Sequence, residues 1–80
     1  MMLWRLVVAA YNDPQAENRE KILAWGAAEL ALVRHRDALG GLPADADDVR
    51  RIAMEEFGVA LDRRSAEAAL EERRRPGFRE

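Results

Sequence analysis

The chain has 80 residues, one histidine, no cysteine and a net charge of −2. The absence of cysteine excludes disulfides, and one histidine without a thiol does not predict a metal site. Charged residues make up 35% of the chain and aromatic residues only 6%. Because Ala, Leu, Arg and Glu dominate, we expect one all-α domain over residues 1–75 and a flexible tail over residues 76–80.

The first eleven residues, Met1 to Tyr11, are apolar. Arg5 interrupts this run, which is too short to span a bilayer and lacks the basic start of a secretory signal. We therefore expect a cytoplasmic protein without a membrane partner. Residues 3, 6, 7 and 10 fit one face of a helix, whereas residues 6–8 also fit a short strand. A helix is favoured because a lone strand would have no pairing partner.

A long central helix is predicted from Pro14 to Leu39, with Asp13 as its N-cap and Gly40-Gly41 as its stop. Its segment 22–33 carries a single charge, Glu29. The bulky apolar residues of this helix point in three directions. A helix that is apolar on most sides is normally covered on most sides, so we expect three or four helices packed around it. The rest of the chain can cover two of these sides, and the third is predicted to meet a second copy or a partner.

Two shorter helices are predicted in the second half. Asp45 caps the first of them, and Asp48, three residues later, forms a motif related to the capping box. Gly58 ends this helix. Asp62 or Ser65 caps the second, which ends in the arginine run 73–75 before a proline. Residues 46, 49, 52, 53 and 57 form the apolar stripe of the first helix, and residues 66, 69 and 70 that of the second.

Charge is divided unevenly between these two helices. Residues 41–62 carry two arginines and six acids, a net of −4, whereas residues 63–80 carry six arginines and four acids, a net of +2. The amphipathic helix, the glycine after Phe57 and the capped basic helix together resemble the helix-turn-helix of small bacterial, phage and transposase DNA-binding domains. The resemblance covers Val49 to about Arg74. The same charges also suit an ordinary helical hairpin with salt-bridged surfaces.

The resemblance implies that residues 62–75 lie in the major groove of double-stranded DNA. The residues that would contact DNA lie on the outer face and at the two ends of this helix: Arg63, Arg64, Ala68, Arg74 and Arg75. The arginines at its start would lie where base edges are usually read.

A second set of residues suits a protein interface: Trp4, Trp25, Glu29, Leu32 and Met54. Tryptophans are enriched at interface hot spots, although core packing is their commoner role. Glu29 needs an ion-pair partner inside an apolar helix, and Arg36 or Arg5 is expected to supply it. His35 suits an exposed position near a helix C-terminus.

No pattern of nucleophile, base or phosphate-binding loop is present, so we expect neither an enzyme nor a cofactor or small-molecule substrate. Two hypotheses follow. The first is a small regulatory or accessory protein that binds DNA through its C-terminal half. The alternative is a homodimeric or partner-docking module that uses the apolar central helix. An adaptor or inhibitor encoded by a mobile element would fit this second description.

Overall fold

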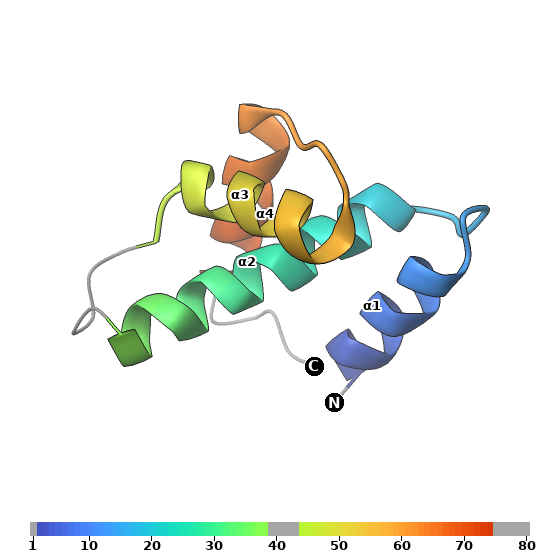
Figure 1. Cartoon of the computed structure of the whole chain (residues 1–80), viewed down its shortest axis with the longest axis horizontal. Helices are drawn as coiled ribbons and strands as arrows, with labels where there is room; N and C mark the ends of the chain where they lie inside the picture. Colours follow the sequence, from blue (N-terminus) through green and yellow to red (C-terminus); the bar gives the residue numbers. More distant parts are fainter. Residues whose placement is uncertain (1, 39–43, 75–80) are drawn as a thin grey trace.

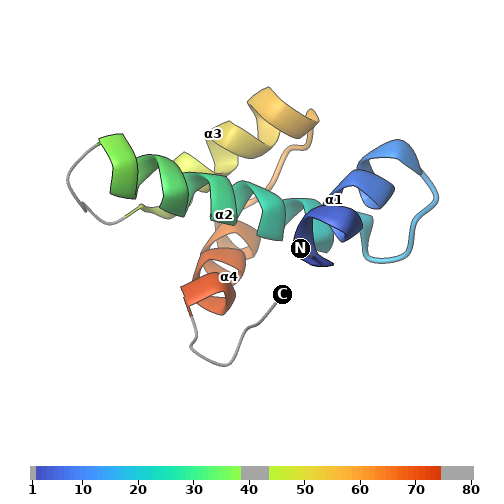
Figure 2. The ribbon, with the colours of Figure 1, turned by 90° about the horizontal axis from the view of Figure 1, so that it is seen from below.

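The computed structural model describes the backbone of residues 2–38 and 44–74, and the side chains of residues 3–34 and 44–74. Four helices occupy these residues: α1 (Met2–Asn12), α2 (Arg19–Ala38), α3 (Ala46–Phe57) and α4 (Arg63–Arg74). α2 is the central rod, with α1 beside its N-terminal end and α3 and α4 packed against it (Figures 1 and 2). The all-α prediction is confirmed. The predicted stop at Gly40-Gly41, the tail 76–80, Arg75 and the side chains of His35 and Arg36 lie outside the described residues.

The first segment is a helix, as predicted, and it packs on the start of α2 through one face. Leu3, Val7 and Ala10 of α1 are buried together with Leu23 of α2. The two helices approach closely at Gly26, where a Cβ atom would lie 3.0 Å from Val7 Cγ2. A glycine in the middle of a helix weakens the helix, and here it makes room for the neighbouring helix.

The predicted start of the long helix at Pro14 is wrong, because Asp13 forms a turn instead of a helix cap. Its carboxylate accepts the N–H of Gln15 at 3.0 Å, and its carbonyl accepts the N–H of Ala16 at 3.0 Å. The chain becomes helical only after Asn18, which has a φ of 58°. Asn is one of the few residues that adopts this conformation readily, so the turn is compatible with its sequence.

Local signals set the bounds of α3 and α4. Asp45 and Asp48 form a reciprocal capping box at the start of α3, and Gly58 ends it in the left-handed region with a φ of 66°. The carboxylate of Asp62 accepts the N–H of Ser65 at 2.7 Å at the start of α4. The pKa of Asp62 is lowered because it accepts hydrogen bonds from the backbone and then the side chain of Ser65. The predicted caps Asp45 and Asp62 are therefore confirmed.

Small residues fill the contact between α2 and the C-terminal pair of helices, α3 and α4. Ala27, Ala28 and Ala31 of α2 are fully buried against Val49, Ile52, Ala66 and their neighbours. The large apolar side chains of α2 that the structure describes are all at least half-buried, because three helices pack around it. The prediction that one side of this helix is bare is therefore wrong. The exposed large apolar side chains of the described residues are Leu6, Val8, Tyr11 and Met54.

No helix in the described part of the chain combines the length and the apolar character needed to cross a membrane.

Candidate functional site

The outer side of α1 is the most apolar exposed surface among the described residues. Leu6 is 44% exposed, Val8 57% and Tyr11 50%, although these residues belong to a helix of only eleven residues. We call Trp4, Arg5, Val8, Ala9 and Tyr11 the α1 surface, and Leu6 is not part of it because it lies about 160° around the helix from Val8. Single exposed apolar residues are common, but a cluster of them is typical of an interaction site.

Two hollows lie along the α1 surface, and Trp4 and Val8 line both of them. One, of about 280 Å³, runs between α1 and the end of α3, where Phe57 and Glu56 form the opposite wall. The rings of Tyr11 and Phe57 lie 6.2 Å apart there. The other is shallow and almost flat, and Arg5 and Ala9 of α1 complete its lining.

Charge is distributed asymmetrically along the α1 surface. Arg5, Ala9 and Asp13 are all exposed and follow each other at intervals of four residues. Residues four apart lie on the same face of a helix, so Arg5 and Ala9 share one face of α1, and Asp13 carries an acidic group in the turn that follows. Asp13 directly follows the helical residues of α1.

The predicted interface residues lie in different places. Trp4 is half-buried on the α1 surface, and Met54 is 51% exposed on α3. Leu32 is half-buried and packs against the core between α2 and the C-terminal pair. Trp25 and Glu29 lie together at the contact with α4, where the indole Nε1 of Trp25 donates to Glu72 Oε2 at 3.1 Å.

The expected ion pair of Glu29 is present, and its partner is Arg73 of α4. Arg73 donates to Glu29 Oε1 from Nη2 at 2.7 Å and from Nε at 3.2 Å. The Arg73 side chain is 8% exposed and that of Glu29 is 20% exposed. The prediction named Arg36 or Arg5 instead, because the true partner is 44 residues away in the sequence.

The residues predicted to contact DNA are only partly available on α4. Arg64 and Ala68 are exposed. Arg63 is exposed and donates to Glu67 Oε1 at 3.1 Å, one turn along the same helix. Arg74 donates from Nη2 to the carbonyl of Ala44 at 2.7 Å, so this side chain helps to join α4 to the start of α3.

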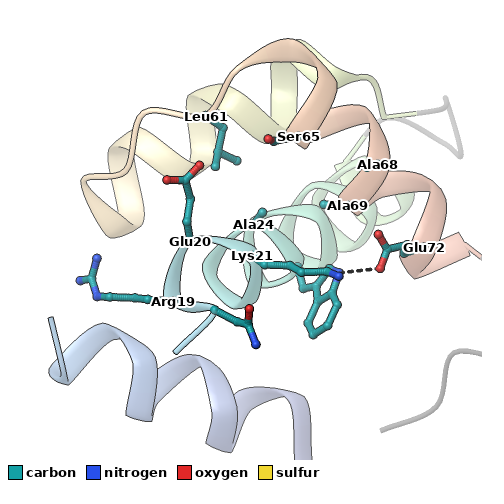
Figure 3. A pocket seen from close by; sticks show the side chains of 11 residues that line it. Arg19, Glu20, Lys21, Ala24, Leu61, Ser65, Ala68, Ala69 and Glu72 are labelled. Carbon is teal, nitrogen blue, oxygen red and sulfur yellow. Dashed lines mark hydrogen bonds between the residues drawn. The ribbon is translucent and has the colours of Figure 1, made fainter. Parts of the chain in front are cut away.

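A cleft of about 560 Å³ lies between the first turns of α2 and one side of α4 (Figure 3). Eleven residues line it: Asn18, Arg19, Glu20, Lys21, Ala24, Trp25, Leu61, Ser65, Ala68, Ala69 and Glu72. Nothing in the sequence predicted this cleft. It joins residues that are more than forty positions apart, and their spacing along the chain gives no local signal of it.

Within the described residues, no group of three or more His, Cys, Asp or Glu side chains is placed to hold a metal ion. Comparison of the chain with protein-family models, curated proteins and solved structures gives no match. The candidate sites therefore rest on the chain's own geometry.

Proposed function

We propose that this protein is a small interaction module that assembles with a second copy of itself through the α1 surface. The observation that carries the proposal is the exposure of Val8 and Tyr11 beside the half-buried Trp4 on one side of a short helix. Covering apolar surface contributes roughly 25 cal/mol for each Å² removed from water. These side chains are not covered by α2, and a second copy of the chain would remove them from water.

The charge pattern favours a second copy as the occupant. In a two-fold symmetric contact the same surface is used on both chains, and the two α1 helices are antiparallel when the two-fold axis is perpendicular to them. A two-fold axis near Ala9 brings Arg5 of each copy opposite Asp13 of the other, since both lie four residues from Ala9. The two charges are eight positions apart in the sequence, about 12 Å at the rise of a helix, so they do not neutralise each other within a chain. The small side chain of Ala9 allows the helices to approach closely.

The size of the surface predicts a weak dimer. Stable complexes bury about 800 Å² on each partner, and one side of an eleven-residue helix offers less than that. The hollow between α1 and Phe57 extends the contact onto α3. We therefore expect dissociation constants in the micromolar range.

Charge exchange tests the arrangement. Arg5→Glu and Asp13→Lys should each weaken dimerisation, because each places like charges opposite one another. An equimolar mixture of the two variants should dimerise again. In the mixed dimer the introduced glutamate faces the introduced lysine, and the remaining native Arg5 faces the remaining native Asp13. Exposed pairs contribute about 0.2–1 kcal/mol each, so the expected change for two pairs is several-fold in the dissociation constant.

Sedimentation velocity over a range of concentrations measures the mass, and circular dichroism checks the fold. Glu17→Lys is the matched control, because Glu17 is an exposed charge outside the α1 surface. A native chain that stays monomeric up to hundreds of micromolar removes the proposal. If the native chain dimerises and all three variants dimerise as strongly as it does, the antiparallel arrangement is removed.

Double-stranded DNA binding through α4 is a second candidate function. It is favoured by Arg63 and Arg64, which are exposed at the first two positions of a helix that a five-residue segment joins to α3. Helix-turn-helix domains read base edges with the start of their second helix. Arg63→Ala together with Arg64→Ala should abolish a salt-sensitive shift of duplex DNA in a gel. The candidate is removed if the native chain does not retard any duplex at low salt.

A further inference from the structure

The cleft between α2 and α4 has a wall of small side chains. One side of α4 faces the start of α2 and carries Ser65, Ala68 and Ala69. Positions three and four residues after Ser65 lie on its side of the helix. Ala24 and Leu61 also line the cleft, although they are buried in the core at 3% and 4% exposure (Figure 3). The volume of about 560 Å³ is in the range of natural ligand sites, which are mostly apolar with a few placed polar groups.

Trp25 forms the aromatic wall of the cleft, and its ring is fixed in orientation. Its Nε1 donates to Glu72 Oε2 at 3.1 Å across the contact with α4. The Nζ of Lys21 lies 5.4 Å from the centroid of the same ring. A cation over the face of an indole is attracted by the ring, most strongly where water is excluded. The cleft therefore already holds a cation, which comes from its own chain.

Carboxylates lie on both walls of the cleft. Glu20 projects from α2 toward the side of Leu61 (Figure 3). Glu72 lies on α4, where it accepts the indole N–H of Trp25. Arg19 extends away from the centre of the cleft, and its guanidinium donates to the carbonyls of Ala10 and Tyr11 of α1. The positive charge of Arg19 is thus directed to α1. Lys21 is the basic group of the cleft that would compete with a cationic ligand for the Trp25 ring.

We propose that this cleft binds a peptide segment of a partner protein through an arginine or lysine that follows an apolar residue. The ligand's cation takes the place of Lys21 over the Trp25 ring, on the side of the cleft where Glu72 lies. The apolar residue packs on the exposed side chain of Ala68. This site does not depend on self-assembly through α1, because it lies between α2 and α4 and shares no residue with the α1 surface.

The indole N–H resonance of Trp25 in a two-dimensional NMR spectrum reports directly on the site, and Trp4→Phe assigns the other indole. The probe is N-acetyl-leucyl-arginine amide, and its control is N-acetyl-leucyl-citrulline amide, which has the same shape without the charge. The arginine dipeptide should shift the Trp25 resonance with saturation in the millimolar range, and the citrulline dipeptide should bind at least several-fold more weakly. No shift at tens of millimolar, or equal binding of the two dipeptides, overturns the proposal.

Three variants locate the binding. Ala68→Leu fills the cleft and should abolish the shift, whereas Ala60→Leu, at an exposed alanine of the segment before α4, should leave it unchanged. Glu72→Gln keeps an acceptor for the indole and removes the charge, so it should weaken binding several-fold. Lys21→Met removes the competing cation and should tighten binding several-fold. A Lys21→Met variant that binds more weakly than the native chain contradicts the displacement of Lys21. The same titration on the Arg5→Glu variant should give the native result, whether or not self-assembly occurs.

Discussion

Replacing Glu29 by leucine tests how α4 is held on α2. The carboxylate accepts two hydrogen bonds from Arg73, at 2.7 and 3.2 Å, in a place where the arginine side chain is only 8% exposed. Breaking a fully buried pair costs about 3–5 kcal/mol, because one desolvated charge loses its partner. Glu29 itself is 20% exposed, so the lower end of that range, about 3 kcal/mol, is expected. A chain of this length has only roughly 4–12 kcal/mol of stability, and the melting temperature should fall by roughly 12–24 °C.

The difference in exposure also predicts an asymmetry between the two partners. Arg73→Met leaves a carboxylate that can turn to water, and this change should cost about 1–2 kcal/mol. Glu29→Leu combined with Arg73→Met removes both charges and should recover most of the lost stability. Urea unfolding of all four proteins at one concentration, followed by circular dichroism, gives the free energies. This account of the pair is refuted if Glu29→Leu costs no more than Arg73→Met, or if the double variant is the least stable of the four.

Three further changes test other parts of the fold. Leu23→Ala should cost about 2–5 kcal/mol in urea unfolding, since Leu23 is fully buried between α1 and α2, and a loss under about 1 kcal/mol would contradict that packing. Gly58→Ala should lower the free energy of unfolding by about 1–2 kcal/mol, because a φ of 66° is unfavourable for a residue with a Cβ atom. An unchanged stability would show that the backbone at this position is not strained by a side chain. Asp62 has a lowered pKa in the folded chain, so its contribution to stability is present above its ordinary pKa of about 3.9 and is lost as the pH falls through the folded value. The stability difference between the native chain and Asp62→Asn should therefore be largest at neutral pH and shrink in acid. A difference that grows in acid would contradict a lowered pKa of Asp62 in the folded chain.

The parts of the fold that could be predicted from the sequence are those fixed by neighbouring residues. Asp45, Asp48 and Gly58 act within one turn of the helix that they bound, so their roles are visible in the sequence order. Asp13 and Pro14 carry the same kind of local signal and gave a wrong helix start. The carboxylate of Asp13 is equally able to accept an N–H in a turn, and in the folded chain it accepts that of Gln15.

The parts that could not be predicted depend on which helices meet. The pairing of Glu29 with Arg73 and the cleft beside Trp25 both require the packing of α2 against α4, which helical periodicity does not determine. The same limit explains why the exposed apolar surface was assigned to the central helix. Periodicity shows that α2 is apolar on several sides, but only the packing of α1, α3 and α4 shows that those sides are covered.

Arg19 connects the folding of the first two helices. It is the first residue of α2, yet its guanidinium satisfies the carbonyls of Ala10 and Tyr11 at the end of α1. Isolated helices shorter than about 12–15 residues are marginal in water, and α1 has only eleven. Its last turn is completed by a side chain that is in place only once α2 has formed. The α1 surface should therefore be absent from a nascent or partly unfolded chain, so that a partner selecting this surface would recognise the folded state.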